Sequence, residues 1–144
     1  MNAAEMWRAS GIAGAYDAWS FGEDPDGLAA LVLCGKKTAT ASAYPVYAAE
    51  GEPLPEPGQY SVILNAREEA VCVIRTVAVR VTPFDQVTAD HAAAEGEGDL
   101  SLEYWRRAHR AFFQKEMAQA GLSFDGHMPV VLETFELVYP KEEP

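Results

Sequence analysis

Residues 35–42, with the sequence GKKTATAS, place a lysine and a threonine three positions apart. A threonine hydroxyl can act as a nucleophile, and a lysine can activate it or stabilise an oxyanion. Side chains alternate between the two faces of a regular strand, so Lys37 and Thr40 share a pocket only if Lys37 lies on a preceding turn. The spacing also fits a solvated lysine pair followed by a threonine-rich edge strand.

A second group of polar residues spans 88–99, with the sequence TADHAAAEGEGD. His91 and Glu95 are four positions apart, so a helix brings them into contact on one face. A carboxylate at a helix C-terminus opposes the helix dipole, and this local cost points to function. Glu97 and Asp99 add oxygen donors, but the run lacks the ligand pattern of a calcium loop, so we predict neither a metal nor a cofactor. The pattern also fits a solvated acidic helix end.

A third group, SLEYWRRAHRAFF at 101–113, combines arginines with aromatic residues at helical spacing. Arg106 and Arg110 share a helical face, and together with Arg107 they can form a local anion site. We interpret His109 and the aromatic residues as side chains of the core or its rim.

The composition limits the partners that these residues can serve. The chain of 144 residues has 11 Lys+Arg and 22 Asp+Glu, a formal net charge of −11, and 49% hydrophobic residues. Such a chain can bury the core of one domain. The negative charge disfavours non-specific nucleic-acid contacts and anionic membranes. Acidic residues gather at 50–56, at 95–103 and in the C-terminal tail, whereas the motif at 35–42 contains two lysines. We therefore expect a small-molecule ligand in a locally cationic pocket.

The N-terminus and the cysteines indicate the compartment. Glu5 and Arg8 interrupt the segment in which a signal peptide would need an apolar core, and the longest apolar run, 28–34, is too short to span a bilayer. We interpret Cys34 and Cys72 as buried thiols of a reduced, cytoplasmic protein with no membrane partner.

The spacing of apolar residues and the positions of capping residues, Gly and Pro predict helices and strands in an irregular alternation. This order predicts an α+β fold with a small, largely antiparallel sheet or barrel, in one domain over 1–144 with a short N-terminal helical extension. The expected helices are 3–9, a short helical segment through 16–21, a helix from the N-cap Asp24 to Cys34, one capped by Thr88 that runs to Glu95, and one capped by Ser101 that runs to Gly121. The expected strands are 38–42, 60–64, 70–81 and 128–139, with a Pro-rich loop at 51–58.

Several motifs together resemble a known family, the ASCH domain of the PUA-like superfamily. Gly35-x-Lys37-x-x-Thr40 is followed by a strand pair, then by PFDQVT, His91-Ala-x-x-Glu95-Gly, SLEYWRRAH and MPVV, and the resemblance covers 16–139. It implies a mixed or antiparallel β-barrel of about five to six strands with flanking helices, and a cleft between the lysine turn and the Glu-bearing helix. Within the family, the chain resembles the small stand-alone bacterial proteins.

The resemblance also implies an activity. Small bacterial ASCH proteins include amidohydrolases that remove the acetyl group from N4-acetylcytidine with a catalytic Lys, Thr and Glu, which match Lys37, Thr40 and Glu95. In one version Lys37 activates Thr40, and Glu95 orients the groups or protonates the leaving amine. If Lys37 and Glu95 form an ion pair, Lys37 instead stabilises the oxyanion and Glu95 is the base. The usual family motif has an arginine where this chain has Ser42.

Several aromatic side chains could bind the substrate, and two other functions fit the sequence. Tyr16, Trp19, Phe21 and Tyr44 are candidates for an aromatic wall against a base, and each suits the core equally well. Two alternatives to the amidohydrolase are an RNA-binding or RNA-cleaving module, with a basic strip formed by the lysine pair and the arginines, and a non-catalytic sensor of a modified nucleoside. The predicted substrate-binding residues are Trp19, Phe21, Lys36, Ser42, Tyr44 and Arg106.

Overall fold

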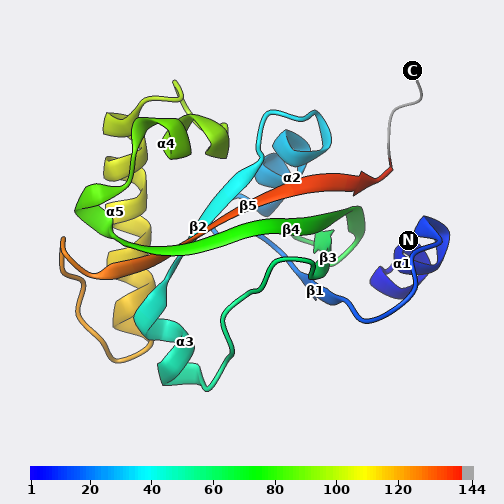
Figure 1. Cartoon of the computed structure of the whole chain (residues 1–144), viewed down its shortest axis with the longest axis horizontal. Coiled ribbons are helices and arrows are strands. Elements are labelled where there is room, and N and C mark those ends of the chain that lie inside the picture. Colours follow the sequence, from blue (N-terminus) through cyan, green and yellow to red (C-terminus); the bar gives the residue numbers. More distant parts are fainter. Residues whose placement is uncertain (141–144) are drawn as a thin grey trace.

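The computed structural model describes residues 1–140, so the acidic tail at 141–144 lies outside the described residues. One mixed sheet of five strands crosses the described part of the chain in the order β1-β3-β4-β5-β2 (Figure 1). The edge strand β1 runs parallel to β3, and the other neighbours are antiparallel. This confirms the predicted α+β class. The strands are β1 (Asp17–Trp19), β2 (Ala39–Ala43), β3 (Tyr60–Leu64), β4 (Ala70–Pro83) and β5 (Pro129–Tyr139).

Four of the five α-helices in this region begin at a side chain that caps their backbone. Asn2, Asp24, Thr88 and Ser101 each accept a hydrogen bond from an N–H of the first turn. No helix among the described residues is both long and apolar enough to cross a membrane. The helices are α1 (Ala3–Ser10), α2 (Pro25–Leu33), α3 (Tyr44–Glu50), α4 (Ala89–Glu95) and α5 (Leu102–Gln119), with a 3-10 turn at Phe84–Gln86.

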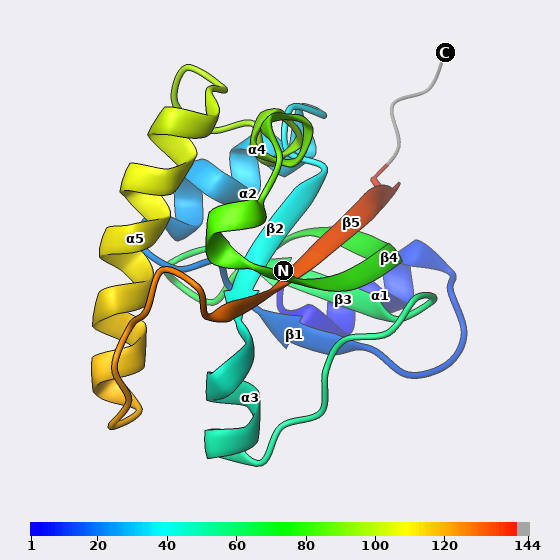
Figure 2. The same ribbon diagram turned by 60° about the vertical axis from the view of Figure 1, so that its left-hand side comes forward.

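The helices cover the sheet in separate groups. Trp105, Phe113 and Met117 on α5 recur at helical spacing and are buried against the ends of β2 and β5. Helix α2 buries Ala29 and Val32 against β3 and β4. Helix α1 packs at the far end of the sheet from α4 and α5 (Figure 1). In Figure 2, α2 and α4 lie near the start of β2, which places the two halves of the candidate site beside one strand.

One element before the lysine motif was predicted wrongly, and one helix after the motif was not predicted. The segment 16–21 was predicted to be helical, but it contains strand β1, because the edge of β3 supplies backbone partners for residues 17–19. Helix α3 was not predicted. It follows β2 directly and has Pro45 in its first turn, where a missing N–H costs nothing.

The prediction for the cysteines was right for one thiol and wrong for the other. Cys72 is fully buried on β4, and burial raises the pKa of its thiol to about 12. Cys34 is exposed, because it lies at the C-cap of α2, beyond the helix face that Ala29 and Val32 bury.

Candidate active site

The turn between α2 and β2 directs Lys37 into the molecule. Gly35 adopts a left-handed conformation (φ +85°), and the N–H groups of Lys36 and Lys37 both donate to the carbonyl of Leu31 at 3.0 Å. Lys37 therefore lies on this turn, while Thr40 lies on β2. This is the arrangement that the sequence required for the two side chains to cooperate.

The C-terminus of α4 packs on this turn through a glycine. Gly96 has φ +74°, and a Cβ built on it would lie 2.3 Å from the carbonyl oxygen of Lys36. The neighbouring Thr38 N–H donates to the carbonyl of Ala94 at 2.8 Å. Only a residue without a side chain allows both the backbone conformation and this close approach. The contact brings Glu95 beside Lys37.

Lys37 is buried and surrounded by acceptors. Its side chain is 1% exposed, and Nζ lies 3.3 Å from Glu95 Oε1, 3.0 Å from Glu97 Oε2 and 3.4 Å from the carbonyl oxygen of Glu95. Three acceptors match the three hydrogens of an ammonium group. Nζ also lies 5.2 Å from the centre of the Phe21 ring. These contacts give each hydrogen of the ammonium group an acceptor within the protein.

Glu95 has partners on both carboxylate oxygens. Oε1 faces Lys37 and His109, while Oε2 accepts from Trp105 Nε1 at 2.6 Å and lies 2.9 Å from His91 Nε2. Burial by itself raises the pKa of Glu95, but hydrogen bonds with His109 and His91 and the charges of His109 and Lys37 outweigh it and hold the pKa well below its usual value. Glu95 is therefore ionised, which favours the ion-paired version of the site.

His109 belongs to this cluster, although the sequence analysis interpreted it as a core or rim side chain. Its ring stacks on Trp105 with centroids 4.2 Å apart, and Nδ1 lies 2.9 Å from the carbonyl oxygen of Trp105. A carbonyl only accepts, so Nδ1 carries a hydrogen. The contact of 3.3 Å between Nε2 and Glu95 Oε1 is attractive only if Nε2 is protonated as well. The geometry therefore fits an imidazolium ring.

Glu95, Glu97 and His109 also bring possible metal ligands together. One ligand atom from each lies within 4.8 Å of the others. The Lys37 ammonium already contacts both carboxylates. A metal ion bound by these three residues would have to displace Lys37, so the cluster is better explained as a site completed by the lysine.

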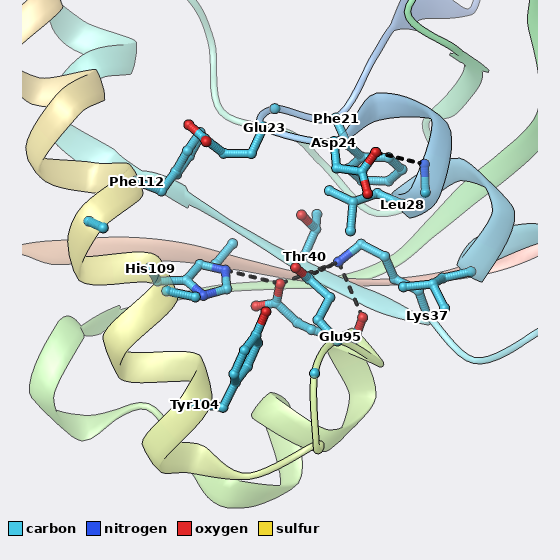
Figure 3. A pocket seen from close by; sticks show the side chains of 18 of the residues that line it. Phe21, Glu23, Asp24, Leu28, Lys37, Thr40, Glu95, Tyr104, His109 and Phe112 are labelled. Carbon is cyan, nitrogen blue, oxygen red and sulfur yellow. Dashed lines mark hydrogen bonds and ion pairs between the residues drawn. The ribbon is translucent and has the colours of Figure 1, made fainter.

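The Lys37, Thr40, Glu95 and His109 side chains converge on a cavity of about 700 Å³ (Figure 3). Phe21, Phe112 and Tyr104 contribute aromatic surface to it. A cavity of this size suits a small ligand, with an apolar wall for a ring and a few polar groups that fix its orientation. Lys37, Thr40, Glu95 and Phe21, predicted from separate motifs, thus line one cavity.

The remaining predicted residues lie elsewhere. Trp19 and Ser42 line a second, adjoining cavity of about 490 Å³. Lys36, Tyr44 and Arg106 line neither cavity. The guanidinium of Arg106 donates to the carbonyl of Asp85.

Two further residues considered for ligand binding, Tyr16 and Arg110, make contacts outside the main cavity. Tyr16 stacks on Trp7, with ring centroids 4.8 Å apart. The guanidinium of Arg110 lies over the rings of Phe84 and Phe124. Neither side chain lines the cavity that contains Lys37.

Comparisons with known proteins agree on one family. The model of the ASCH domain family matches residues 17–139. A crystal structure of an ASCH domain from Lactobacillus crispatus JV V101 is 32% identical, with a TM-score of 0.89, and the match covers 94% of this chain and 93% of that one. Protein EF3133 from Enterococcus faecalis V583 is 34% identical, with a TM-score of 0.85, over 98% of this chain and 92% of that one. The hypothetical protein PH0355, at 15% identity and a TM-score of 0.55, shares the fold. No curated protein matches the chain.

Proposed function

We propose that this chain, which belongs to the ASCH domain family with its PUA-like fold, is an amidohydrolase. The proposed substrate is an N-acylated nucleoside such as N4-acetylcytidine, from which the enzyme removes the acyl group. The observation that carries the proposal is the buried contact between Lys37 and Glu95 beside Thr40, in one cavity. These are the lysine, glutamate and threonine that the motif resemblance assigns to amide hydrolysis.

Lys37 acts as the cation that stabilises the developing oxyanion. A fixed ammonium group in a site with little water stabilises negative charge more strongly than the same group in solvent. Glu95 and Glu97 both contact the Lys37 ammonium and fix its position. The role of an unprotonated lysine base fits this environment poorly, because an amine has only two hydrogens for the three acceptors around Nζ.

Thr40 is the nucleophile, and Glu97 is the carboxylate that accepts its proton. Glu95 has partners on both oxygens and a lowered pKa, so it anchors Lys37 and His109 rather than donating a proton. The Glu97 side chain is 22% exposed, and Lys37 is its one side-chain hydrogen-bond partner among the described residues. Its carboxylate can therefore exchange a proton during the reaction.

The proposed reaction has two steps. The Thr40 hydroxyl oxygen bonds to the carbonyl carbon, the C–N bond breaks, and the hydroxyl proton passes through Glu97 to the leaving nitrogen, which releases the free nucleoside. A water molecule then hydrolyses the threonine ester, releasing acetic acid and restoring the hydroxyl. The rings of Phe21 and Phe112 provide the surface against which the base stacks.

The test is incubation of the protein with N4-acetylcytidine and other N-acylated nucleosides, followed by chromatography of the products. The proposal predicts equal amounts of cytidine and acetate from N4-acetylcytidine. Thermal stabilisation by the nucleoside without product would contradict hydrolysis and favour the sensor. RNA binding that falls steeply with salt, without hydrolysis, would favour the RNA-binding alternative.

A further inference from the structure

The second cavity, of about 490 Å³, is lined by apolar and neutral polar residues together with several carboxyl groups. Carboxyl groups reach it from β1, α3, the segment after α3, α5 and β5, and no Lys, Arg or His of the described residues lines it. The titratable residues that line it are Asp17, Tyr47, Glu50, Glu52, Glu116 and Glu133.

Glu133 is the most deeply buried of these carboxyl groups. It lies in the middle of β5, is 8% exposed and has no ion-pair partner among the described residues. Burial raises its pKa to about 6, although a hydrogen bond with the Thr76 side chain opposes the rise. A buried carboxylate is normally paired with a cation, and none of the ion pairs within residues 1–140 includes Glu133.

The other carboxyl groups add to the negative potential around Glu133. Glu116 on α5 is partly buried, and burial together with the charge of Glu50 raises its pKa. Ser42 and Tyr47, whose hydroxyl oxygens lie 2.7 Å apart, add neutral hydrogen-bonding groups. These repulsions would be relieved by a positive charge placed between the carboxylates.

The two cavities meet at Thr40. Both are lined by Thr40, Ala41, Phe21, Gly22 and Phe112. Thr40 on β2 is paired in register with Glu133 on β5, and residues directly opposite each other on antiparallel strands lie on the same face. A ligand whose amide lies at Thr40 can therefore extend one end toward Glu133.

We propose that the second cavity is a subsite for a positively charged nitrogen, an alkylammonium or guanidinium group, carried by the molecule whose amide bond reaches Thr40. The position of the amide rests on the proposed function, whereas the binding of the cation rests on the cavity alone. The same carboxylates repel phosphate, so the subsite discriminates against phosphorylated ligands and polynucleotides.

The test compares two amides that differ by one charge, N-(4-aminobutyl)acetamide and N-butylacetamide, by calorimetric titration at pH 7.5 and physiological salt. We expect the charged amide to bind at one site roughly 10- to 100-fold more tightly, as for a hydrogen bond between charged groups. Glu133→Gln should abolish most of this difference. Glu116→Gln, at a less buried position, should reduce it if Glu133→Gln does not fold. Glu103→Gln makes the same charge change on α5 outside both cavities and should leave it unchanged.

The pH dependence gives a second readout of the same experiment. Glu133 loses its proton as the pH rises through about 6, so affinity for the charged amide should rise by about tenfold between pH 5 and pH 8, following the ionised fraction of that carboxyl group. Equal affinity for the two amides in the unmodified protein would overturn the inference, whatever the result with N4-acetylcytidine. Failure to hydrolyse N4-acetylcytidine, with the charged amide still preferred, would overturn the proposed function and leave the subsite intact.

Discussion

The Lys37 ammonium and the Glu95 carboxylate form an ion pair at 3.3 Å, although the residues lie 58 positions apart and both side chains are almost fully buried. Burying two charges is costly unless further hydrogen bonds satisfy both groups. Here Glu97 completes the surroundings of Lys37, while His91, His109 and the indole of Trp105 complete those of Glu95. The pair and its partners determine the charge state of the cavity.

Removal of one charge of this pair should destabilise the fold. We expect Lys37→Met to lower the free energy of unfolding by about 3 to 5 kcal/mol, because Glu95 and Glu97 lose their shared cation. Denaturant unfolding of Lys37→Met, Glu95→Gln and the double variant measures the coupling. The double variant should lose much less than the sum of the single losses, and strict additivity would contradict a direct interaction.

His109 should control the acid stability of the protein through Glu95. The lowered pKa of Glu95 contributes stability that is present above its unfolded pKa of about 4.5 and is lost as the pH falls through its lower folded value. His109→Phe keeps a ring against Trp105 but removes the hydrogen bond, so acid unfolding monitored by circular dichroism should shift to higher pH. His127→Phe, at an exposed ring, is the control. An unchanged midpoint in His109→Phe would contradict the interaction.

Gly96 should be required for the contact between α4 and the lysine turn. We expect Gly96→Ala to cost about 2 to 4 kcal/mol of stability, since it adds a left-handed strain to a clash with the Lys36 carbonyl. Gly121 has a similar φ of +76° but open space around it, so Gly121→Ala isolates the strain. Thermal unfolding compares the two variants. Equal losses would show that the close approach contributes nothing.

Glu133 should make the protein less stable as the pH rises. Its folded pKa of about 6 lies above its unfolded value of about 4.5, so its stabilising contribution is complete below pH 4.5 and is lost as the pH rises through 6. Glu133→Gln lacks this titration. Urea unfolding gives the free energy of unfolding of Glu133→Gln minus that of the unmodified protein. This difference should be about 2 kcal/mol more favourable to the variant at pH 7 than at pH 4.5. Glu103→Gln should show no such change.

Most of the fold could be predicted from local signals, whereas Lys37, Thr40 and Glu95 were assigned through the resemblance of their motifs to the ASCH domain. Capping residues mark α2, α4 and α5, and apolar runs on either side of the polar turn at 65–69 mark β3 and β4. Strand β1 could not be predicted in this way, because its three residues are held by pairing with β3 rather than by a pattern of their own.

The parts of the site that were missed depend on tertiary packing. His109 follows Trp105 at helical spacing, which is also the pattern of a core histidine, and only the packing of α5 against α4 brings its ring to Glu95. Trp19 and Ser42 were predicted to bind the substrate, and they line the adjoining cavity. Register places Glu133 opposite Thr40, and strand pairing cannot be read from the composition of either strand.

The proposed amidohydrolase activity is tested most directly by the rate at which Thr40→Val and Lys37→Met release cytidine from N4-acetylcytidine. These rates are compared with that of the unmodified protein. Thr40→Val keeps the shape of the side chain and removes the hydroxyl, so kcat/KM should fall by about 10³-fold or more while the protein stays folded. Lys37→Met should lower kcat/KM by at least about 100-fold, because the oxyanion loses its stabilising cation. Cytidine release by Thr40→Val within a few-fold of the unmodified rate, or no release by the unmodified protein, would contradict a Thr40 and Lys37 amidohydrolase.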